Sequence, residues 1–121
     1  IIARDSEGLQ MISACCAEAK LNIKDIKYLP KNKIFLFSLE RLKKEDENQN
    51  KKVKSICKFE SVESVKSKNI NQKDSDLSIE LIGIDLFKNK EKFDINLIFS
   101  KNTYITLTAE IIEVILEDQN E

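Results

Sequence analysis

The first part of the chain carries apolar residues at helical spacing. Four of them recur every three to four positions and fall on one helix face: Leu9, Ile12, Cys16 and Ala19. Asp5 or Ser6 precedes this run and can accept a hydrogen bond from the first helical turn as an N-cap. The pattern therefore predicts a helix that begins after this cap and ends near residues 20–22.

From Ile23 onward the apolar and polar residues alternate, which is the period of a β-strand. Six alternating segments predict six strands: 23–29, 34–42, 53–65, 77–87, 93–99 and 103–118. Turn residues separate several of them, including 30–33 and Lys101-Asn102. The alternation slips by one residue at three places, which we interpret as β-bulges: Glu60-Ser61, Leu81-Ile82 and Ile111-Ile112.

Segment 34–42 is apolar on both of its faces, which predicts a central strand covered on both sides, with the helix on one of them. Residues 43–52 include no apolar residue and predict a mobile, solvated hairpin loop. Residues 66–76 predict a second polar loop.

The last segment leaves two interpretations open. Residues 108–117 are apolar enough for a terminal helix, but their β-branched residues favour a strand. Residues 110–115 also echo residues 60–65, since each stretch has glutamate at its first and fourth positions at the end of a third strand. Either the chain contains two related three-stranded units, or the similarity is chance.

Together these elements predict an α+β fold in one domain that spans residues 1–121. We expect the N-terminal helix to pack on a curled, mostly antiparallel β-sheet of about six strands, arranged as a partly open barrel or a two-layer sandwich. A chain of 121 residues can bury one core but is short for two domains.

Charge and cysteine usage narrow the classes of partner and compartment. The 20 basic and 21 acidic residues leave a net charge of -1, which does not support binding to nucleic acid or to a membrane surface. No apolar run approaches the roughly 18 residues that span a bilayer. The three cysteines are an odd number, and two of them are adjacent, which predicts reduced thiols and a cytoplasmic location.

The chain offers few groups for catalysis. It contains no histidine, the commonest general base and zinc ligand in enzymes. Neither glycine lies in a phosphate-binding loop, and the acidic clusters 45–47 and 74–76 lack the spacing of a calcium loop. We therefore predict no catalytic residue, no metal site and no cofactor.

Arg41 is the candidate binding residue. It continues the face of segment 34–42 that carries Phe35, Phe37 and Leu39, where a cation needs a partner. Only two of the 20 basic residues are arginines, and guanidinium offers a planar fork that lysine lacks. We expect a structural ion pair with a carboxylate, with Glu60 and Glu110 as the candidate partners, and keep ligand binding as the alternative.

Four stretches resemble, in order, the motifs of one known family. Residues 3–14 (ARDSEGLQMISA) resemble its AxDxxDLxxISA opening, and residues 34–42 (IFLFSLERL) resemble its FALxLNRF strand. Residues 77–84 (LSIELIGI) and 105–118 (ITLTAEIIEVILED) resemble its LSLLAIxF strand and its closing IRLxVExIExxLxDL segment. The chain is thus similar to an uncharacterised alphaproteobacterial family, domain of unknown function 2948. The resemblance implies a cytoplasmic single-domain protein and assigns no activity.

These observations favour a small cytoplasmic binding or interaction module without catalysis. The expected partner is another protein or a second copy of the chain, and neither nucleic acid nor a membrane is expected. The alternative is an enzyme that acts on a small acidic metabolite through carboxylates and Arg41. A third interpretation is an accessory subunit with a large flat interface.

Overall fold

The computed structural model describes residues 1–42, 51–71 and 73–119. It contains one α-helix, one short 3-10 helix and ten strands within these residues. In chain order they are β1 (Ile2–Ala3), α1 (Ser6–Cys16), β2 (Lys20–Asn22), η1 (Ile23–Asp25), β3 (Ile26–Leu29), β4 (Ile34–Leu42), β5 (Lys52–Phe59), β6 (Val62–Lys68), β7 (Ser78–Asn89), β8 (Lys92–Phe99), β9 (Thr103–Ala109) and β10 (Val114–Asp118).

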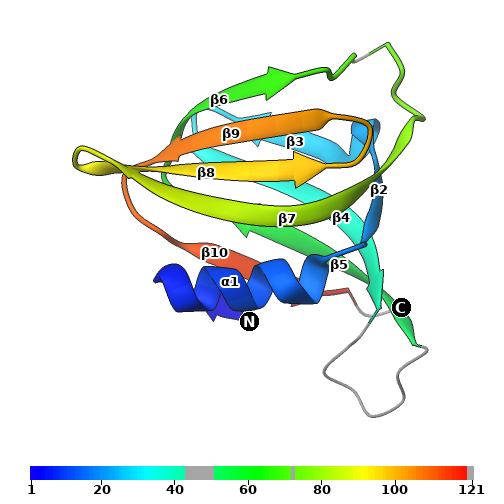
Figure 1. The fold of residues 1–121 in the computed structure, drawn as a ribbon, viewed down its shortest axis with the longest axis horizontal. Coiled ribbons are helices and arrows are strands. Elements are labelled where there is room, and N and C mark those ends of the chain that lie inside the picture. The colour runs from blue at the N-terminus through cyan, green and yellow to red at the C-terminus, as the bar shows by residue number, and fades with distance from the viewer. Residues whose placement is uncertain (43–50, 72, 120–121) are drawn as a thin grey trace.

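All strand pairs are antiparallel and belong to one unclosed sheet in the order β1-β10-β5-β4-β2-β7-β8-β9-β6, with β3 also paired to β4. The sheet folds over itself, so that β7, β8, β9 and β6 form one layer and β3, β4, β5 and β10 form the other (Figure 1). Short β2 joins the layers, because Lys20 pairs with Glu40 of β4 and with Glu80 of β7. The predicted α+β class is confirmed.

The predicted number of six strands is wrong for two reasons. The short strands β1 and β2 were not predicted, and residues 23–25 of the first predicted strand form η1 instead. In addition, two of the phase slips are crossings between layers, and each divides one predicted strand into two. At residues 60–61 the chain leaves β5 and enters β6, which pairs with β9 in the other layer. At residues 110–113 it leaves β9 and enters β10, which pairs with β5. The slip at Leu81-Ile82 is a bulge as predicted, since the register of β7 and β8 shifts between Leu81 and Gly83.

The two crossings lie against each other and have the same form. The Glu60 N–H donates to the Glu113 carbonyl at 3.0 Å, and the Glu110 N–H donates to the Ser61 carbonyl at 3.1 Å. The registers of the two layers also correspond. Across β4, β5 and β10, the residues opposite one another are Leu39, Ser55 and Asp118. Across β8, β9 and β6, the equivalent row is Leu97, Ile105 and Ser67. The strands β3–β6 and β7–β10 are thus arranged about an approximate two-fold axis, and each unit gives its last strand to the other layer.

The N-terminal helix is shorter than predicted. It begins after Asp5, whose carboxylate accepts a hydrogen bond from the Gly8 N–H at 2.7 Å, and it ends at Cys16. Ala17 is extended and Glu18 has a φ of 69°, so the backbone cannot continue as a helix. Ala19, predicted on the helical face, is buried in the connection to β2 instead.

The helix fills the gap between the layers on one side of the molecule. It packs against β7, β1 and β4, and Figure 1 shows it in front of β10, on the side of the molecule away from β6. We call this gap the closed seam. On the opposite side β3 faces β6, and we call this gap the open seam. The prediction that both faces of β4 are covered is wrong. The helix packs against β4 on its core side, and Ile34 and Leu36 of the outer face stay only half-buried.

Buried side chains of the described residues form one core between the layers. Four phenylalanines at its centre are in ring contact: Phe35, Phe37, Phe59 and Phe99. The C-terminal segment is β-strand on both sides of its crossing, as its β-branched residues favoured. The predicted loop at 43–52 lies largely outside the described residues, except that Lys52 begins β5. Among the helices that the structure describes, none is long and apolar enough to cross a membrane.

Candidate functional site

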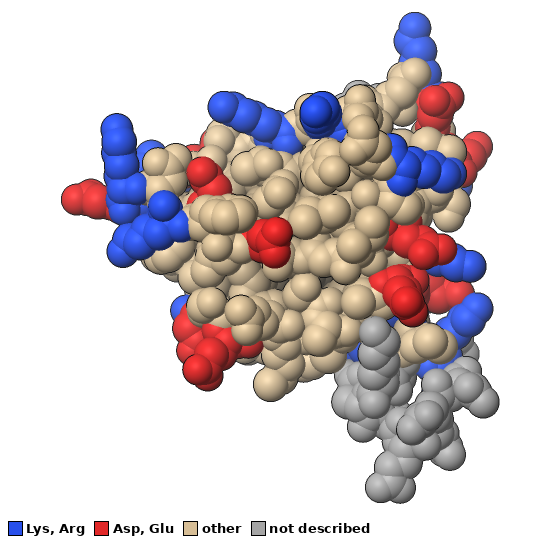
Figure 2. Space-filling view, in the orientation of Figure 1, with Lys and Arg blue, Asp and Glu red and all other residues tan. Residues whose placement is uncertain are grey.

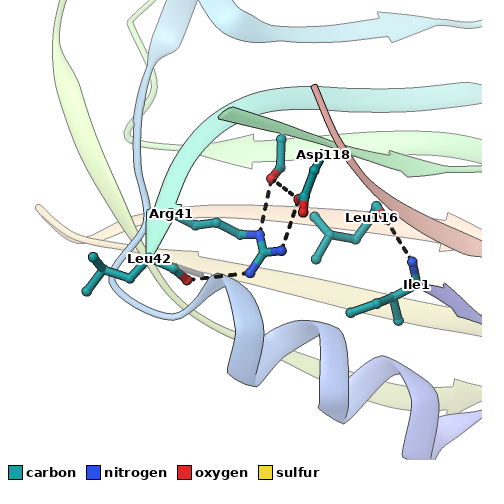
Figure 3. Close-up of polar contacts among 6 residues, drawn as sticks. Ile1, Arg41, Leu42, Leu116 and Asp118 are labelled. Carbon is teal, nitrogen blue, oxygen red and sulfur yellow. Dashed lines mark hydrogen bonds and ion pairs between the residues drawn. The ribbon is translucent and has the colours of Figure 1, made fainter. Parts of the chain in front are cut away.

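Arg41 lies at one end of the β4 face that also carries the core phenylalanines, and its side chain is 1% exposed. Its Nε donates to Ser55 Oγ at 3.1 Å, and its second terminal nitrogen donates to Asp118 Oδ1 at 2.9 Å (Figure 3). Ser55 Oγ in turn donates to the same carboxylate oxygen at 2.7 Å. The guanidinium, the hydroxyl and the carboxylate therefore form one hydrogen-bonded cluster that ties β4, β5 and β10 together.

The predicted pairing of Arg41 with a carboxylate is present, but both predicted partners are wrong. Arg41 faces Val53 in the β4–β5 register, so Glu60 lies about seven residues, or about 23 Å, from Arg41 along the strand. Glu110 lies near that same end and pairs with Lys33 at 3.4 Å. Asp118 reaches Arg41 because β10 crosses into this layer and runs beside β5. A ligand role for Arg41 stays a prediction that the structure does not test.

The open seam contains an apolar groove of about 360 Å³. Its walls come from η1, β3, β4, β6, β9 and the loop that follows β6, and the lining residues are Ile23, Lys24, Ile26, Tyr28, Phe35, Val65, Ser67, Ile70, Ser75 and Ile105. Seven of these ten are apolar or aromatic, and several belong to the core. A groove of this size and lining is at the lower end of the range for ligand sites in proteins.

Hydrogen bonds join the two walls of the groove near both of its ends. At one end the Lys24 N–H donates to the Ser75 carbonyl at 3.0 Å. At the other end the Tyr28 hydroxyl donates to the Val62 carbonyl at 3.1 Å, and the Val62 N–H donates to the Lys33 carbonyl at 2.8 Å. Between these ends, the described residues show no backbone hydrogen bond between β3 and β6. Two strand edges with unpaired backbone groups therefore flank the groove.

Exposed lysines stand on both edges of the groove. Lys27 belongs to β3, and Lys66 and Lys68 belong to β6; we call these three the lysine rim. None of them has an acidic partner within 4 Å among the residues that the structure describes. Figure 2 shows basic side chains along the upper margin of the molecule, where β6 lies in Figure 1. The margin is locally positive although the chain has a net charge of -1.

Two other hollows have weaker features. The larger, of about 510 Å³, lies over β2, β4 and β5, where Lys20 and Lys54 stand beside Asp25 and Glu40. Its lining has as many acidic as basic residues, so it presents no net charge to a ligand. A third, of about 370 Å³, lies between α1 and β7 and includes exposed Phe87.

Residues 1–121, the whole chain, match the family model described as a protein of unknown function, DUF2948. The chain belongs to this family. No curated protein and no solved structure matches it. The DUF2948 assignment confirms the family that the sequence motifs indicated, and it assigns no activity to the groove or to Arg41.

Cysteines of this DUF2948 protein lie in the helix and beneath it. Cys16 of α1 and Cys57 of β5 are buried and Cys15 is half-buried, and all three are thiols that form no disulfide. The hydrogen bond with Cys16 raises the pKa of the Cys57 thiol well above its usual value, and burial raises it further. No group of three acidic or thiol side chains among the described residues of this DUF2948 chain is placed to hold a metal ion.

Sequence reasoning missed the groove of the DUF2948 fold. The sequence pattern places the lysines of β6 in a polar loop, because the segment 66–76 has little apolar content. In the structure Lys66 and Lys68 pair with Thr106 and Tyr104 of β9, so this part of the segment is an edge strand. Lysines on a short alternating strand are a known feature of unpaired edges, and this signal could have located the open seam.

Proposed function

We propose that this protein is a non-catalytic binding module and that the groove of the open seam is its binding site. The single observation that carries the proposal is an apolar groove that reaches core residues between two unpaired strand edges. Binding sites in proteins are usually concave and mostly apolar, with a few polar groups at the margin. Here the margin is supplied by the lysine rim.

The enzyme alternative has less support. It requires the Arg41 guanidinium to meet a substrate, but this group is engaged with Ser55 and Asp118. The chain also contains no histidine to serve as a general base. We further propose a cytoplasmic location, which the three reduced thiols support.

A neutral apolar dye, Nile red, tests the groove as a binding site. The chain contains no tryptophan, so Ser67→Trp both fills the groove and reports its own surroundings by fluorescence. The matched control is Ser64→Trp on the same strand, since Ser64 faces Thr108 on the outer side of the layer. We expect blue-shifted tryptophan emission from the Ser67→Trp variant and solvent-like emission from the Ser64→Trp variant.

Nile red should bind the unmodified protein saturably, bind the Ser64→Trp variant equally well and lose at least tenfold in affinity for Ser67→Trp. Loss of cooperative unfolding would disqualify a variant, so each is first checked by urea denaturation. Equal dye binding by the two folded variants, or no saturable binding to the unmodified protein, would contradict the proposal.

A further inference from the structure

The approximate two-fold relation between the two seams indicates what the groove accepts. The registers make Ile26 of β3 equivalent to Leu86 of β7, and Val65 of β6 equivalent to Leu116 of β10. Both seams are therefore walled by apolar residues at equivalent positions. In the closed seam this chain's own N-terminal segment pairs with the edge of β10 and Leu116 is buried, while Leu86 stays half-buried at the hollow between α1 and β7. In the open seam both equivalent residues line the groove.

The covering of the closed seam begins with strand addition. Residues Ile2–Ala3 form β1, which pairs antiparallel with the outer edge of β10. Around it the Leu116 N–H donates to the Ile1 carbonyl at 2.9 Å, and the Ile1 nitrogen donates to the Leu116 carbonyl at 3.0 Å. The side chain of Ala3 is fully buried, and α1 follows it into the seam. A polypeptide segment in extended form therefore closes this edge.

The equivalent edge of β6 has no such segment among the described residues. The groups that correspond to the Leu116 N–H and carbonyl are those of Val65, for which the described part of the chain supplies no backbone partner across the seam. An extended segment can satisfy these groups and place alternate side chains in the groove. A helix cannot satisfy them, because its own backbone groups are already bonded to one another.

The charge on the two edges of the groove determines which side chains the added segment can carry on its face away from the groove. Alternate residues of an added strand point away from the groove, and there they lie beside Lys27, Lys66 and Lys68. The acid of β6, Glu63, is already held by an ion pair with Lys92. Acidic side chains at these alternate positions complement the lysine rim, and basic ones are repelled by it.

We infer that the groove binds an extended segment of a partner protein in which apolar residues alternate with acidic ones, and that this segment adds a strand to the free edge of β6. The inference rests on the proposed function, since it names the occupant of the same groove. The lysine rim then discriminates among partners, in addition to keeping the edges from pairing with other copies of the chain.

A synthetic peptide of eight alternating valine and glutamate residues, blocked at both ends, tests the inference with the full chain. The peptide carries a fluorescent label so that binding is followed by fluorescence anisotropy, and the backbone amide shifts of β3 and β6 locate the site. We expect lysine in place of glutamate in the peptide to abolish binding. The peptide N–H groups on the edge that faces β6 donate to that strand, so N-methylation of this edge should weaken binding at least tenfold. N-methylation of the opposite edge should weaken binding less.

Charge reversal on the protein supplies the matched comparison. The double variant Lys66→Glu and Lys68→Glu should weaken binding of the valine–glutamate peptide at least tenfold. The control double variant Lys88→Glu and Lys90→Glu has the same change in net charge on the exposed β7–β8 hairpin and should stay within twofold of the unmodified protein. Raising the salt concentration should reduce the difference between the two variants.

Three outcomes would overturn the inference. The first is saturable binding of Nile red without binding of the valine–glutamate peptide. The second is equal peptide affinity in the two charge-reversed variants. The third is tighter binding of an acidic helix-forming peptide with leucine at helical spacing. Each of these leaves the groove as the binding site, whereas the absence of Nile red binding removes both the proposed function and the inference.

Discussion

The closed and open seams are built from equivalent strands and differ in what lies between them. In the closed seam β1 pairs with β10, and Ser13 Oγ of α1 accepts a hydrogen bond from the Ile84 N–H of β7 at 2.9 Å, so both edges have partners. In the open seam, as far as the structure describes it, no strand lies between β3 and β6, and hydrogen bonds from the Tyr28 hydroxyl, the Val62 N–H and the Lys24 N–H join the two sides near the ends of the groove. The closed seam is therefore joined by strand pairing, whereas the open seam contains an apolar groove, which we propose is the binding site.

Truncation of one isoleucine in each seam tests most directly whether the two seams contribute differently to stability. Ile12 of α1 is fully buried, and Ile12→Ala should lower the free energy of unfolding by about 3 kcal/mol through lost burial and a cavity. Ile26 of β3 lines the groove and is half-buried, so Ile26→Ala should cost about 1 kcal/mol or less. Urea denaturation measures both, and equal losses would show that the open seam is packed as tightly as the closed one.

Native thiol labelling measures how rarely the closed seam opens. Cys15 is half-buried, whereas Cys16 and Cys57 are buried, and the raised pKa of Cys57 leaves little reactive thiolate at neutral pH. We expect Cys15 to react with iodoacetamide about a hundredfold faster than the other two, as followed by mass spectrometry. In denaturant all three should be labelled, and fewer labels would contradict the prediction of three reduced thiols.

Substitution of Arg41 tests whether its cluster is structural. Arg41→Ala leaves the buried Ser55 hydroxyl and the partly exposed Asp118 carboxylate without their cation, and should cost about 2 kcal/mol of unfolding free energy. Arg41→Lys keeps the charge and should cost about 1 kcal/mol, because an ammonium cannot reproduce the planar fork. Urea denaturation of the two variants measures both losses.

Neither Arg41 variant should change the affinity for the valine–glutamate peptide, because Arg41 does not line the groove. An unchanged melting temperature combined with loss of an anionic ligand would instead assign Arg41 a binding role.

The smallest effect is expected from the ion pair between Glu63 of β6 and Lys92 of β8. The hydrogen bond from Lys92 lowers the pKa of Glu63 from its usual value, so the contribution of Glu63 to stability is complete above its unfolded-state pKa. This contribution is lost as the pH falls through the lowered pKa of the folded state. Glu63→Gln should therefore reduce the acid dependence of urea denaturation slightly, and an unchanged pH profile would show that the exposed pair contributes nothing.

Much of the fold could be predicted from alternation, but the connectivity could not. The predicted inward face of β4 is confirmed, because Phe35, Phe37 and Leu39 are all buried on it. A phase slip shows that the inward side of the chain changes, but a bulge and a crossing to another layer produce the same slip. The crossings at residues 60–61 and 110–113 are therefore indistinguishable from bulges in the sequence, although the echo between them marks their equivalence.

The site was harder to predict because it is formed by residues distant in sequence. The strand face of Arg41 identifies it as a buried cation, but its partner Asp118 depends on the position of β10. The groove lies between β3 and β6, which are not paired with each other, so no local pattern reports their proximity. Only the edge lysines of β6 carry a local signal, and the low apolar content around them conceals it.

The exchanged last strands also determine when the molecule can fold. During synthesis β6 emerges from the ribosome before β9, the strand it pairs with in the sheet, and β5 emerges before its partner β10. Neither unit can complete its layer from its own residues, so a nascent chain that stops before β9 holds no finished layer. We expect slow, all-or-none folding that depends on distant pairings, with unpaired strands exposed to chaperones until β10 is made.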